Sequence, residues 1–367
     1  MKEPMIMTIG EVCATISDTY RAKADEVTLI NTSDVLEGKV LNHARVPNKE
    51  LKGQFKKTFK KNDILYSEIR PQNKRFAFVD FEPVDYIAST KLMVLRADTK
   101  KVLPMYLFFY LKSAPVIAEL QMLAETRSGT FPQITFTELS NLTIPVPSIT
   151  EQEAIVATIK CIEDKIDCNA KINDNLQQQA QAIYASMFII NADPAWTQGH
   201  LSDLITVKYG KDHKKLADGV YPVFGSGGIM RYVERPLYTG ESVLIPRKGT
   251  LNNVMYVNEP FWSVDTMFFT EMKVPNVAKF VFHFVKAKDL ASMNAGSAVP
   301  SMTTDILNAL ELAIPPADRL AEFESAVTPM YQMMQANSRE SAKLAELRDT
   351  LLPKLMTGEI DVSSIQF

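Results

Sequence analysis

Two stretches of this 367-residue chain resemble each other: FPQITFTELSNLTIPVPS, Phe131–Ser148, and VPSMTTDILNALELAIPP, Val299–Pro316. The second copy follows the first at an offset of 168 residues, which places Pro132 on Pro300. The same offset continues without a gap to Met187. Because a chance resemblance does not keep one phase over so long a segment, we predict two homologous halves.

The repetition extends upstream of these stretches, but there the two copies match more loosely and the offset between them is larger. MTIGEVCATI resembles GHLSDLITVK and places Ile9 on Leu201, an offset of 192. DILYSEIRP resembles ESVLIPRKG and places Arg70 on Arg247, an offset of 177. The offset shrinks along the chain, so the first copy is expected to carry extra residues in loops.

Each half ends in a segment with apolar residues spaced alternately by four and three, the heptad pattern of a long helix. Thr150 with Glu153 forms a capping-box pattern at the start of the first helix, and Asp318 is expected to cap the second. Gly358 is expected to end the second helix, and Pro329 and Pro353 to bend or restart it. The predicted seam residues are Ile155, Ile159, Ile162, Ile166, Asn169, Asn173, Leu176, Ile183 and Met187, with Phe323, Val327, Met330, Met334, Asn337, Ser341, Leu344, Leu351 and Leu355.

Both stripes are polar in the middle, at Asn169 and Asn173 in one helix and at Asn337 and Ser341 in the other. If the helices pair antiparallel, these polar positions meet, and Asn at such a seam fixes the register. The alternative is that each helix lies separately on its own domain.

The predicted fold class is α/β (α+β): two internally repeated globular domains joined by two long antiparallel coiled-coil helices with pseudo-twofold symmetry. The expected division is a domain at 1–149, a helix at 150–190, a domain at 191–316, a helix at 317–358 and a tail at 359–367.

The net charge of −3 does not suit a nucleic-acid binder, but the distribution of charge along the chain removes this objection without establishing DNA binding. Residues 1–147 have a net charge of +3 and residues 191–314 a net charge of zero, whereas the two helical segments each have −3. The globular segments therefore offer a phosphate backbone a neutral or basic field. Three cysteines and a polar N-terminal segment predict a cytoplasmic protein, and the apolar runs are too short to cross a membrane.

Three motifs, in this order and with this repeat, resemble the specificity subunit of type I restriction-modification systems: IPVPSITEQEAIVATI at Ile144–Ile159, YPVFGSGG at Tyr221–Gly228 and LRDTLLPKLMTGEI at Leu347–Ile360. The resemblance implies two target recognition domains that each read half of a bipartite double-stranded DNA sequence. It also implies that the helices set the gap and dock two modification (methyltransferase) subunits, while restriction subunits join the complex. It implies no catalysis and no cofactor in this chain, with S-adenosylmethionine on the modification subunits for adenine methylation and ATP with Mg on the restriction subunits.

Clusters of cations and amides are the candidate DNA contacts, because Arg reads guanine, Asn and Gln read adenine, and Lys binds phosphate. Such clusters are also typical of solvated surface loops. The candidates are Arg70, Gln72, Asn73, Lys74, Arg75, Arg127, Thr130 and Gln133 in the first half, and Lys211, Lys214, Lys215, Ser226, Arg247, Lys248, Asn252 and Asn253 in the second. The glycine-rich YPVFGSGG lacks the spacing of a cofactor loop and is either a tight turn between strands or a loop near DNA.

Three other interpretations compete. An adenine methyltransferase needs a [DN]PP[YF] loop, and the nearest string, DPAW at Asp193–Trp196, does not match it. A protein-binding coiled-coil scaffold gives no reason for basic clusters in both halves. The recognition subunit of a bifunctional type II restriction system is not separated from the type I case by sequence.

Overall fold

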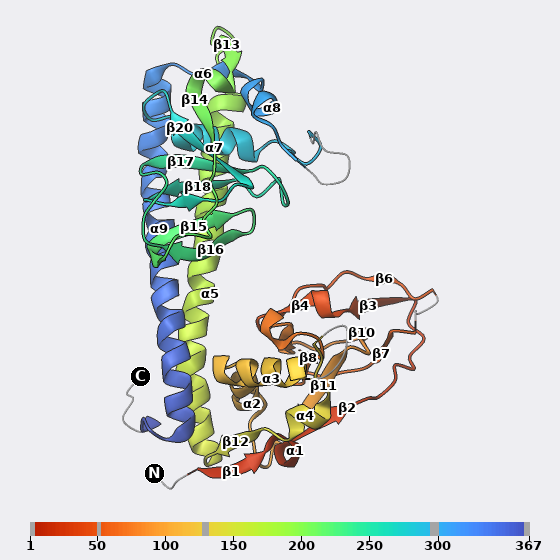
Figure 1. Cartoon of the computed structure of the whole chain (residues 1–367). Helices are drawn as coiled ribbons and strands as arrows, with labels where there is room; N and C mark the ends of the chain where they lie inside the picture. The colour runs from red at the N-terminus through yellow and green to blue at the C-terminus, as the bar shows by residue number, and fades with distance from the viewer. Residues whose placement is uncertain (1–3, 50–52, 127–131, 294–300, 363–367) are drawn as a thin grey trace. The chain divides into compact units, whose positions relative to one another are not determined.

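The computed structural model describes residues 4–49, 53–126, 132–293 and 301–362. The chain forms two compact units (Figure 1). Unit 1 combines Met1–Asn169 with Arg339–Phe367, and unit 2 is the continuous segment Ala170–Ser338. Each unit therefore contains one globular domain together with part of both long helices.

Unit 1 is built on a four-stranded antiparallel sheet in the order β2-β11-β8-β9. These strands are β2 Cys13–Ile16, β11 Leu92–Ala97, β8 Ile64–Ser67 and β9 Phe76–Phe78. A two-stranded ribbon pairs β1, Met5–Thr8, with β12, Thr143–Val146, and the short helix α1, Ile9–Val12, connects β1 to β2. All four residues of β8 are buried because the sheet is covered on both faces.

Unit 2 repeats this plan. Its four-stranded sheet has the order β14-β20-β17-β18, and its ribbon pairs β13 with β21. The elements are β13 Thr197–His200, α6 Leu201–Leu204, β14 Ile205–Tyr209, β17 Glu241–Pro246, β18 Met255–Asn258, β20 Met267–Met272 and β21 Glu311–Ile314. The same elements recur in the same order of pairing, which confirms the two homologous halves.

A second sheet in each unit is also repeated, with additions in unit 1. The order β6-β3-β10-β7 matches β16-β15-β19, and the central pairs β3–β10 and β15–β19 are both parallel. These strands are β3 Glu26–Ile30, β6 Val46–Pro47, β7 Phe55–Lys57, β10 Tyr86–Ser89, β15 Asp218–Gly225, β16 Gly228–Val233 and β19 Trp262–Ser263. Unit 1 adds β7 and the hairpin of β4, Val35–Leu36, with β5, Lys39–Val40. The expectation that the extra residues lie in loops was therefore wrong in part.

Helices cover the sheets. Unit 1 has α2 Pro104–Leu111, α3 Ala114–Thr126 and α4 Phe136–Ser140, and unit 2 has α7 Ala278–Lys286 and α8 Thr304–Asn308. Every residue of α7 but the last is buried. No single helix in the described ranges has the length and hydropathy of a membrane span; the bent pair α2–α3 reaches them only jointly, and most of its apolar residues are in the core.

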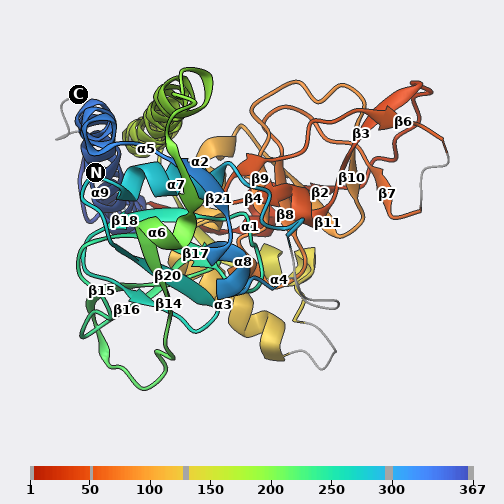
Figure 2. The ribbon, with the colours of Figure 1, turned by 90° about the horizontal axis from the view of Figure 1, so that it is seen from above.

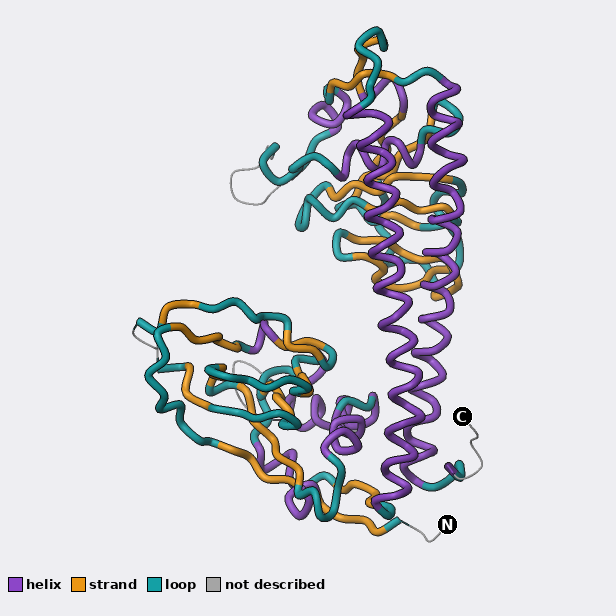
Figure 3. Tube along the Cα trace, turned by 180° about the vertical axis from the view of Figure 1, so that it is seen from behind, coloured by secondary structure: helices purple, strands orange, loops and turns teal. Residues whose placement is uncertain are grey.

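The long helices are α5, Ile149–Ala185, followed by a π-helical turn Ser186–Ile190, and α9, Ala317–Thr357 (Figure 3). The capping box of α5 lies two residues before the predicted one: Ser148 N–H and Oγ donate to Glu151 Oε2, over 2.9 and 2.7 Å. α9 begins one residue before Asp318 and passes through Pro329 and Pro353 without an interruption, which corrects the expected restart. Gly358, at φ +77°, follows its last turn.

The helices pair antiparallel within each unit. In unit 1, Ile155 and Ile159 share a core with Leu352 and Leu355, and Asn169 donates to Ser341 Oγ over 3.3 Å. In unit 2, Asn173 meets Asn337, and farther along the pair Tyr184 meets Phe323. The polar positions thus face each other as expected, and all the predicted seam residues are buried or half-buried.

Candidate nucleic-acid interface

The cation-bearing loops of unit 2 follow strands of its main sheet, in which β14, β20 and β17 lie side by side (Figure 2). β20 runs antiparallel to β14 and β17, so the segments that follow β14 and β17 meet the segment that precedes β20. Lys211 N–H donates to Ser263 O over 2.8 Å, and Arg247 N–H donates to Thr266 O over 2.8 Å. This site lies at one end of the strands, where β14 and β17 finish and β20 begins. Together with the loops 210–217, 226–227 and 247–253, we call it the unit 2 edge.

Arg247 and Lys248 leave β17 at the unit 2 edge. The Arg247 guanidinium lies over the Tyr209 ring, 5.3 Å from its centroid, and Nη1 donates to Asp265 O over 3.4 Å. Lys248 is exposed and forms an isolated bridge with Ser301, within the repeated stretch. Within the described ranges, the Lys248 ammonium makes no hydrogen bond or ion pair, so it is available to a phosphate.

The glycine-rich stretch is a tight turn between β15 and β16, one of its two predicted interpretations. Gly225 faces Gly228, and Ser226 and Gly227 form the turn. Asn253 Nδ2 donates to Ser226 O over 2.8 Å. A Cβ on Gly249 would lie 2.9 Å from Ser226 Oγ, so the turn packs closely on the loop after β17.

Two of the predicted contacts in unit 2, Asn252 and Asn253, make hydrogen bonds inside the protein. Asn252 donates to Asp289 Oδ1 and accepts from Ala291 N–H, both over 3.0 Å. Asn253 uses its amide on the turn at Ser226. Each internal hydrogen bond fixes the orientation of the amide and uses one of its two N–H donors. Residue type alone could not reveal these partners.

The loop after β14 adds charge to the same edge. Lys211, Lys214 and Lys215 are exposed, and across the part of the chain that the structure describes their ammonium groups have no hydrogen bond or ion pair. The Trp262 indole N–H donates to Lys211 O over 2.8 Å and holds the loop against β19. With Arg247 and Lys248, these cations outnumber the nearby exposed Asp212 and Asp265, which favours a polyanionic ligand.

In unit 1 the matching loop follows β8. Pro71–Asn73 forms a 3-10 turn between Arg70 and Lys74, which adopt left-handed φ values of +46° and +52°. Arg70, Gln72 and Asn73 are exposed. Within the described ranges, the side chains of Gln72 and Asn73 make no hydrogen bond. They remain candidates for base contacts.

Arg75 and Lys74 hold the hairpin β4–β5. Arg75 Nη1 donates to Ser33 O over 3.0 Å and to Val35 O over 3.4 Å. Lys74 Nζ pairs with Glu37 Oε1 over 3.0 Å. Arg75 is half-buried and uses its Nη1 inside the fold, whereas Lys74 is exposed and keeps a solvent-facing charge.

The repeated stretch itself borders this loop. Gln133 forms an isolated bridge with Ile69, and Arg70 N–H donates to Pro132 O over 3.1 Å. Gln133 is half-buried. Arg127 and Thr130, predicted in the same segment, lie outside the described residues.

The strand register corrects one predicted equivalence. Cys13 and Ile205, which open β2 and β14, face Ala97 and Met272. Counting along β11 and β20, Ser67 corresponds to Pro246, an offset of 179 rather than 177. Arg70 therefore corresponds to Gly249, and both have left-handed backbones, at φ +46° and +85°.

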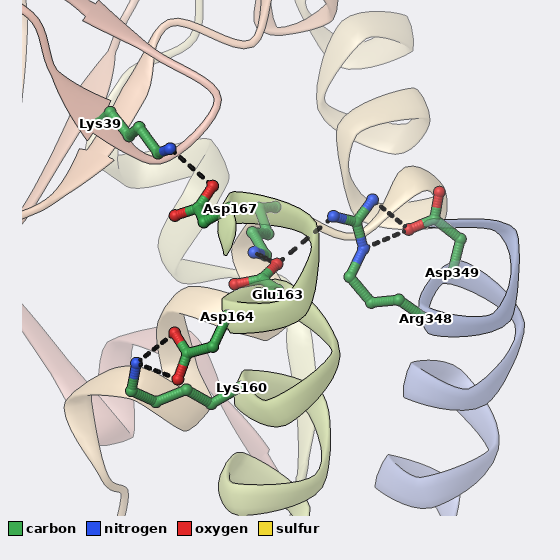
Figure 4. A network of polar contacts seen from close by, with 8 residues as sticks. Lys39, Lys160, Glu163, Asp164, Asp167, Arg348 and Asp349 are labelled. Carbon is green, nitrogen blue, oxygen red and sulfur yellow. Dashed lines mark hydrogen bonds and ion pairs between the residues drawn. The ribbon is translucent and has the colours of Figure 1, made fainter. Parts of the chain in front are cut away.

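The domain of unit 1 is tied to the helices by a polar network (Figure 4). Glu163 on α5 pairs with Lys112, after α2, and with Arg348 on α9 over 3.4 Å. Burial lowers the pKa of Lys112, and Glu163 opposes that shift. Lys39 on β5 reaches Asp167 on α5 over 2.7 Å. Unit 2 uses another solution: buried Lys279 on α7 pairs with Glu241 over 2.9 Å and with Glu324 on α9 over 2.5 Å.

Sequence reasoning missed Tyr209 and the apolar residues of β16. Tyr209 is 52% exposed and carries the Arg247 guanidinium on its ring. An aromatic residue beside a basic run, as in KYGK, was the available signal. Among the described residues, no group of three or more His, Cys, Asp or Glu is placed to hold a metal ion.

The repeated fold defines a protein of two homologous domains that share a pair of long helices. The family model "Type I restriction modification DNA specificity domain" matches residues 1–178 and 195–322. The chain belongs to this family, and it is a type I restriction-modification specificity subunit.

Relatives and a solved structure agree. The chain is 28% identical to the type I restriction enzyme HindI specificity subunit of Haemophilus influenzae, over 96% of this chain and 98% of the relative. It is 21% identical to the MjaIX specificity subunit of Methanocaldococcus jannaschii, over 77% of each chain. The crystal structure of the type I system S subunit from M. genitalium covers 96% of both chains with a TM-score of 0.58 at 18% identity, which indicates a shared fold.

Proposed function

We propose that this chain supplies sequence recognition to a DNA-modifying complex and performs no chemistry itself. Each globular domain reads one half of a bipartite double-stranded DNA target through the loops after β8 and β17. The observation that carries the proposal is that one sheet edge is built twice, with the same scaffold and different cations and amides. A common scaffold with different side chains suits two half-sites of different sequence.

The helices α5 and α9 hold the two domains and dock two modification subunits, and restriction subunits complete the assembly. Support comes from the helix pair, which carries a polar register-setting centre, and from the acidic balance of both helical segments. The modification subunits would bring S-adenosylmethionine for adenine methylation, and the restriction subunits ATP with Mg.

The test is selection from a random-sequence duplex library by this chain assembled with its cognate modification subunits. Bound duplexes are sequenced. The expected result is a two-part motif with a fixed gap and an adenine in each half. The assembled complex should methylate those adenines with S-adenosylmethionine, and this chain alone should not. An intact complex that enriches no motif would contradict the proposal.

A further inference from the structure

The hairpin β15–β16 presents an apolar surface beside the unit 2 edge. Val223 faces Arg231 and Phe224 faces Ile229, so Met230 is an extra residue in β16. In a regular strand Ile229 and Met230 would point to opposite faces, but a bulge redirects one of them. Both are consequently exposed, Ile229 by 50% and Met230 by 62%.

The exposed pair is held in place. Gly225 leaves the space in which the Met230 thioether lies, since a Cβ there would come 2.5 Å from Sδ. The turn at Ser226 is fixed by Asn253, which belongs to the same loop as Lys248. A Cβ added to Gly227 would meet nothing within 4 Å, so the outer side of the turn is open to a ligand.

The occupant of this surface follows from its surroundings. Lys248, Lys211 and Lys214 lie in loops of the same edge, and this charge complements a polyanion better than a neutral protein face. The major groove of B-DNA admits a two-stranded antiparallel ribbon, and its apolar feature is the C5-methyl group of thymine. Burial of this methyl group against apolar side chains is favourable. A contact of the same side chains with a phosphate or sugar does not bury apolar surface in this way.

We infer that Ile229 and Met230 contact the C5-methyl group of a thymine in the half-site that unit 2 reads. The inference rests on the proposed function and adds the specificity-determining residues and the group they recognise. It applies to one half-site, because the equivalent strand β6 in unit 1 contains two residues, Val46–Pro47.

The test uses the complex of this chain with its modification subunits and the target obtained by library selection. Each thymine of the second half-site is replaced in turn by deoxyuridine, which lacks only the C5-methyl group, and the Kd is measured. One replacement is expected to weaken wild-type binding about fourfold. Ile229→Ala and Met230→Ala should bind the thymine and deoxyuridine duplexes with nearly equal affinity. Val220→Ala, on the same hairpin but far from the turn, is 77% exposed in the wild type and should keep the wild-type ratio.

Each outcome has a distinct meaning. If no two-part target is selected at all, the proposed function fails. If the target is selected but every deoxyuridine duplex binds as tightly as its thymine parent, the methyl contact is overturned while the function stands. If Ile229→Ala and Met230→Ala instead prevent assembly with the modification subunits, the hairpin binds protein and the inference is wrong.

Discussion

The side-chain amide of Asn337 donates a 2.8 Å hydrogen bond to Oδ1 of Asn173, across the helix pair of unit 2. Asn173 in turn donates to Met334 O over 3.2 Å and to Ser338 Oγ over 3.3 Å. The pair satisfies itself at one register of α5 against α9, and a slip of one turn would leave amide groups in an apolar seam.

Replacement of one of these two asparagines should therefore lower the free energy of unfolding more than replacement of both. Asn337→Leu leaves Asn173 Oδ1 without its donor and should lower the free energy of unfolding by about 1–3 kcal/mol. Asn173→Leu with Asn337→Leu should recover most of that loss, because the seam becomes uniformly apolar. Urea unfolding followed by circular dichroism measures both. Additive losses in the double variant would show that the pair does not act as a unit.

The Glu163 network predicts a pH-dependent defect. Glu163→Gln removes the carboxylate beside Lys112, whose side chain is 12% exposed, and should destabilise the protein by about 2 kcal/mol at pH 7. Burial lowers the folded-state pKa of Lys112 and Glu163 raises it, so removal of the Glu163 carboxylate should lower that pKa further and let the folded variant lose the Lys112 proton at a lower pH. The stability defect should therefore shrink as pH rises above 7, because a neutral Lys112 amine no longer depends on the carboxylate.

The matched control is Lys160→Ala on the same helix. Lys160 pairs with Asp164 in an exposed contact at 2.8 Å, and its loss should cost less than about 0.5 kcal/mol at any pH. Equal, pH-independent losses in Glu163→Gln and Lys160→Ala would refute the assignment of Glu163 as the partner that stabilises the Lys112 ammonium.

The buried side chain of His283 predicts that unit 2 loses stability at acidic pH. Its Nδ1 lies 2.7 Å from Gln181 Oε1 and its Nε2 2.9 Å from Tyr331 OH. Burial, with a smaller effect of Lys286, lowers the His283 pKa from 6.5 to about 4. Between these values the unfolded chain binds a proton that the folded chain excludes, so stability should fall as pH drops from 6.5 toward 4.

His283→Gln should flatten this pH dependence by about one proton, even though it lowers stability at pH 7. His200→Gln, at an exposed position, should keep the wild-type slope. Denaturation midpoints at half-unit steps of pH provide the comparison. A His283→Gln profile that keeps the wild-type slope would show that another group dominates.

Lys248 predicts the salt dependence of DNA binding. If it neutralises one phosphate, Lys248→Ala should weaken binding to target and non-target duplexes alike and reduce the slope of log K against log salt by about 0.9. Lys273→Ala removes the same charge at the opposite end of the sheet, where Lys273 Nζ donates to Ser202 O. That control should leave the slope unchanged, and a common loss in both variants would indicate a long-range field instead.

The sequence predicted the helices better than the strands, for a geometric reason. The offset of 168 held along α5 and α9 because a heptad seam tolerates no insertion. In the strands, side chains alternate with a period of two, so aligning Arg70 with Arg247 instead of Gly249 preserved the apolar pattern and hid the error. The predicted capping box of α5 was misplaced for a similar reason. Ser148 with Glu151 and Thr150 with Glu153 have the same spacing, so the sequence did not distinguish them.

The sequence indicated which residue types could form the candidate interface, but it did not indicate which of them have hydrogen-bond partners inside the protein. Lys248 and Gln72 are exposed as a DNA contact requires, whereas Asn252 and Arg75 also donate hydrogen bonds inside the fold. These contacts join residues far apart in the chain, such as Asn252 and Asp289, and only tertiary structure brings them together.

The core of unit 1 includes Leu352, Leu355, Met356 and Val362 packed with Ile155 and Ile159. Unit 2 is a continuous segment that the ribosome releases before those residues. During translation unit 2 can therefore fold first. The N-terminal domain is made earlier, but part of its apolar face stays uncovered until the last turns of α9 are synthesised. A released chain that is truncated before residue 350 should accordingly be open to protease in its N-terminal domain and protected in unit 2, whose core includes Leu320, Phe323 and Val327.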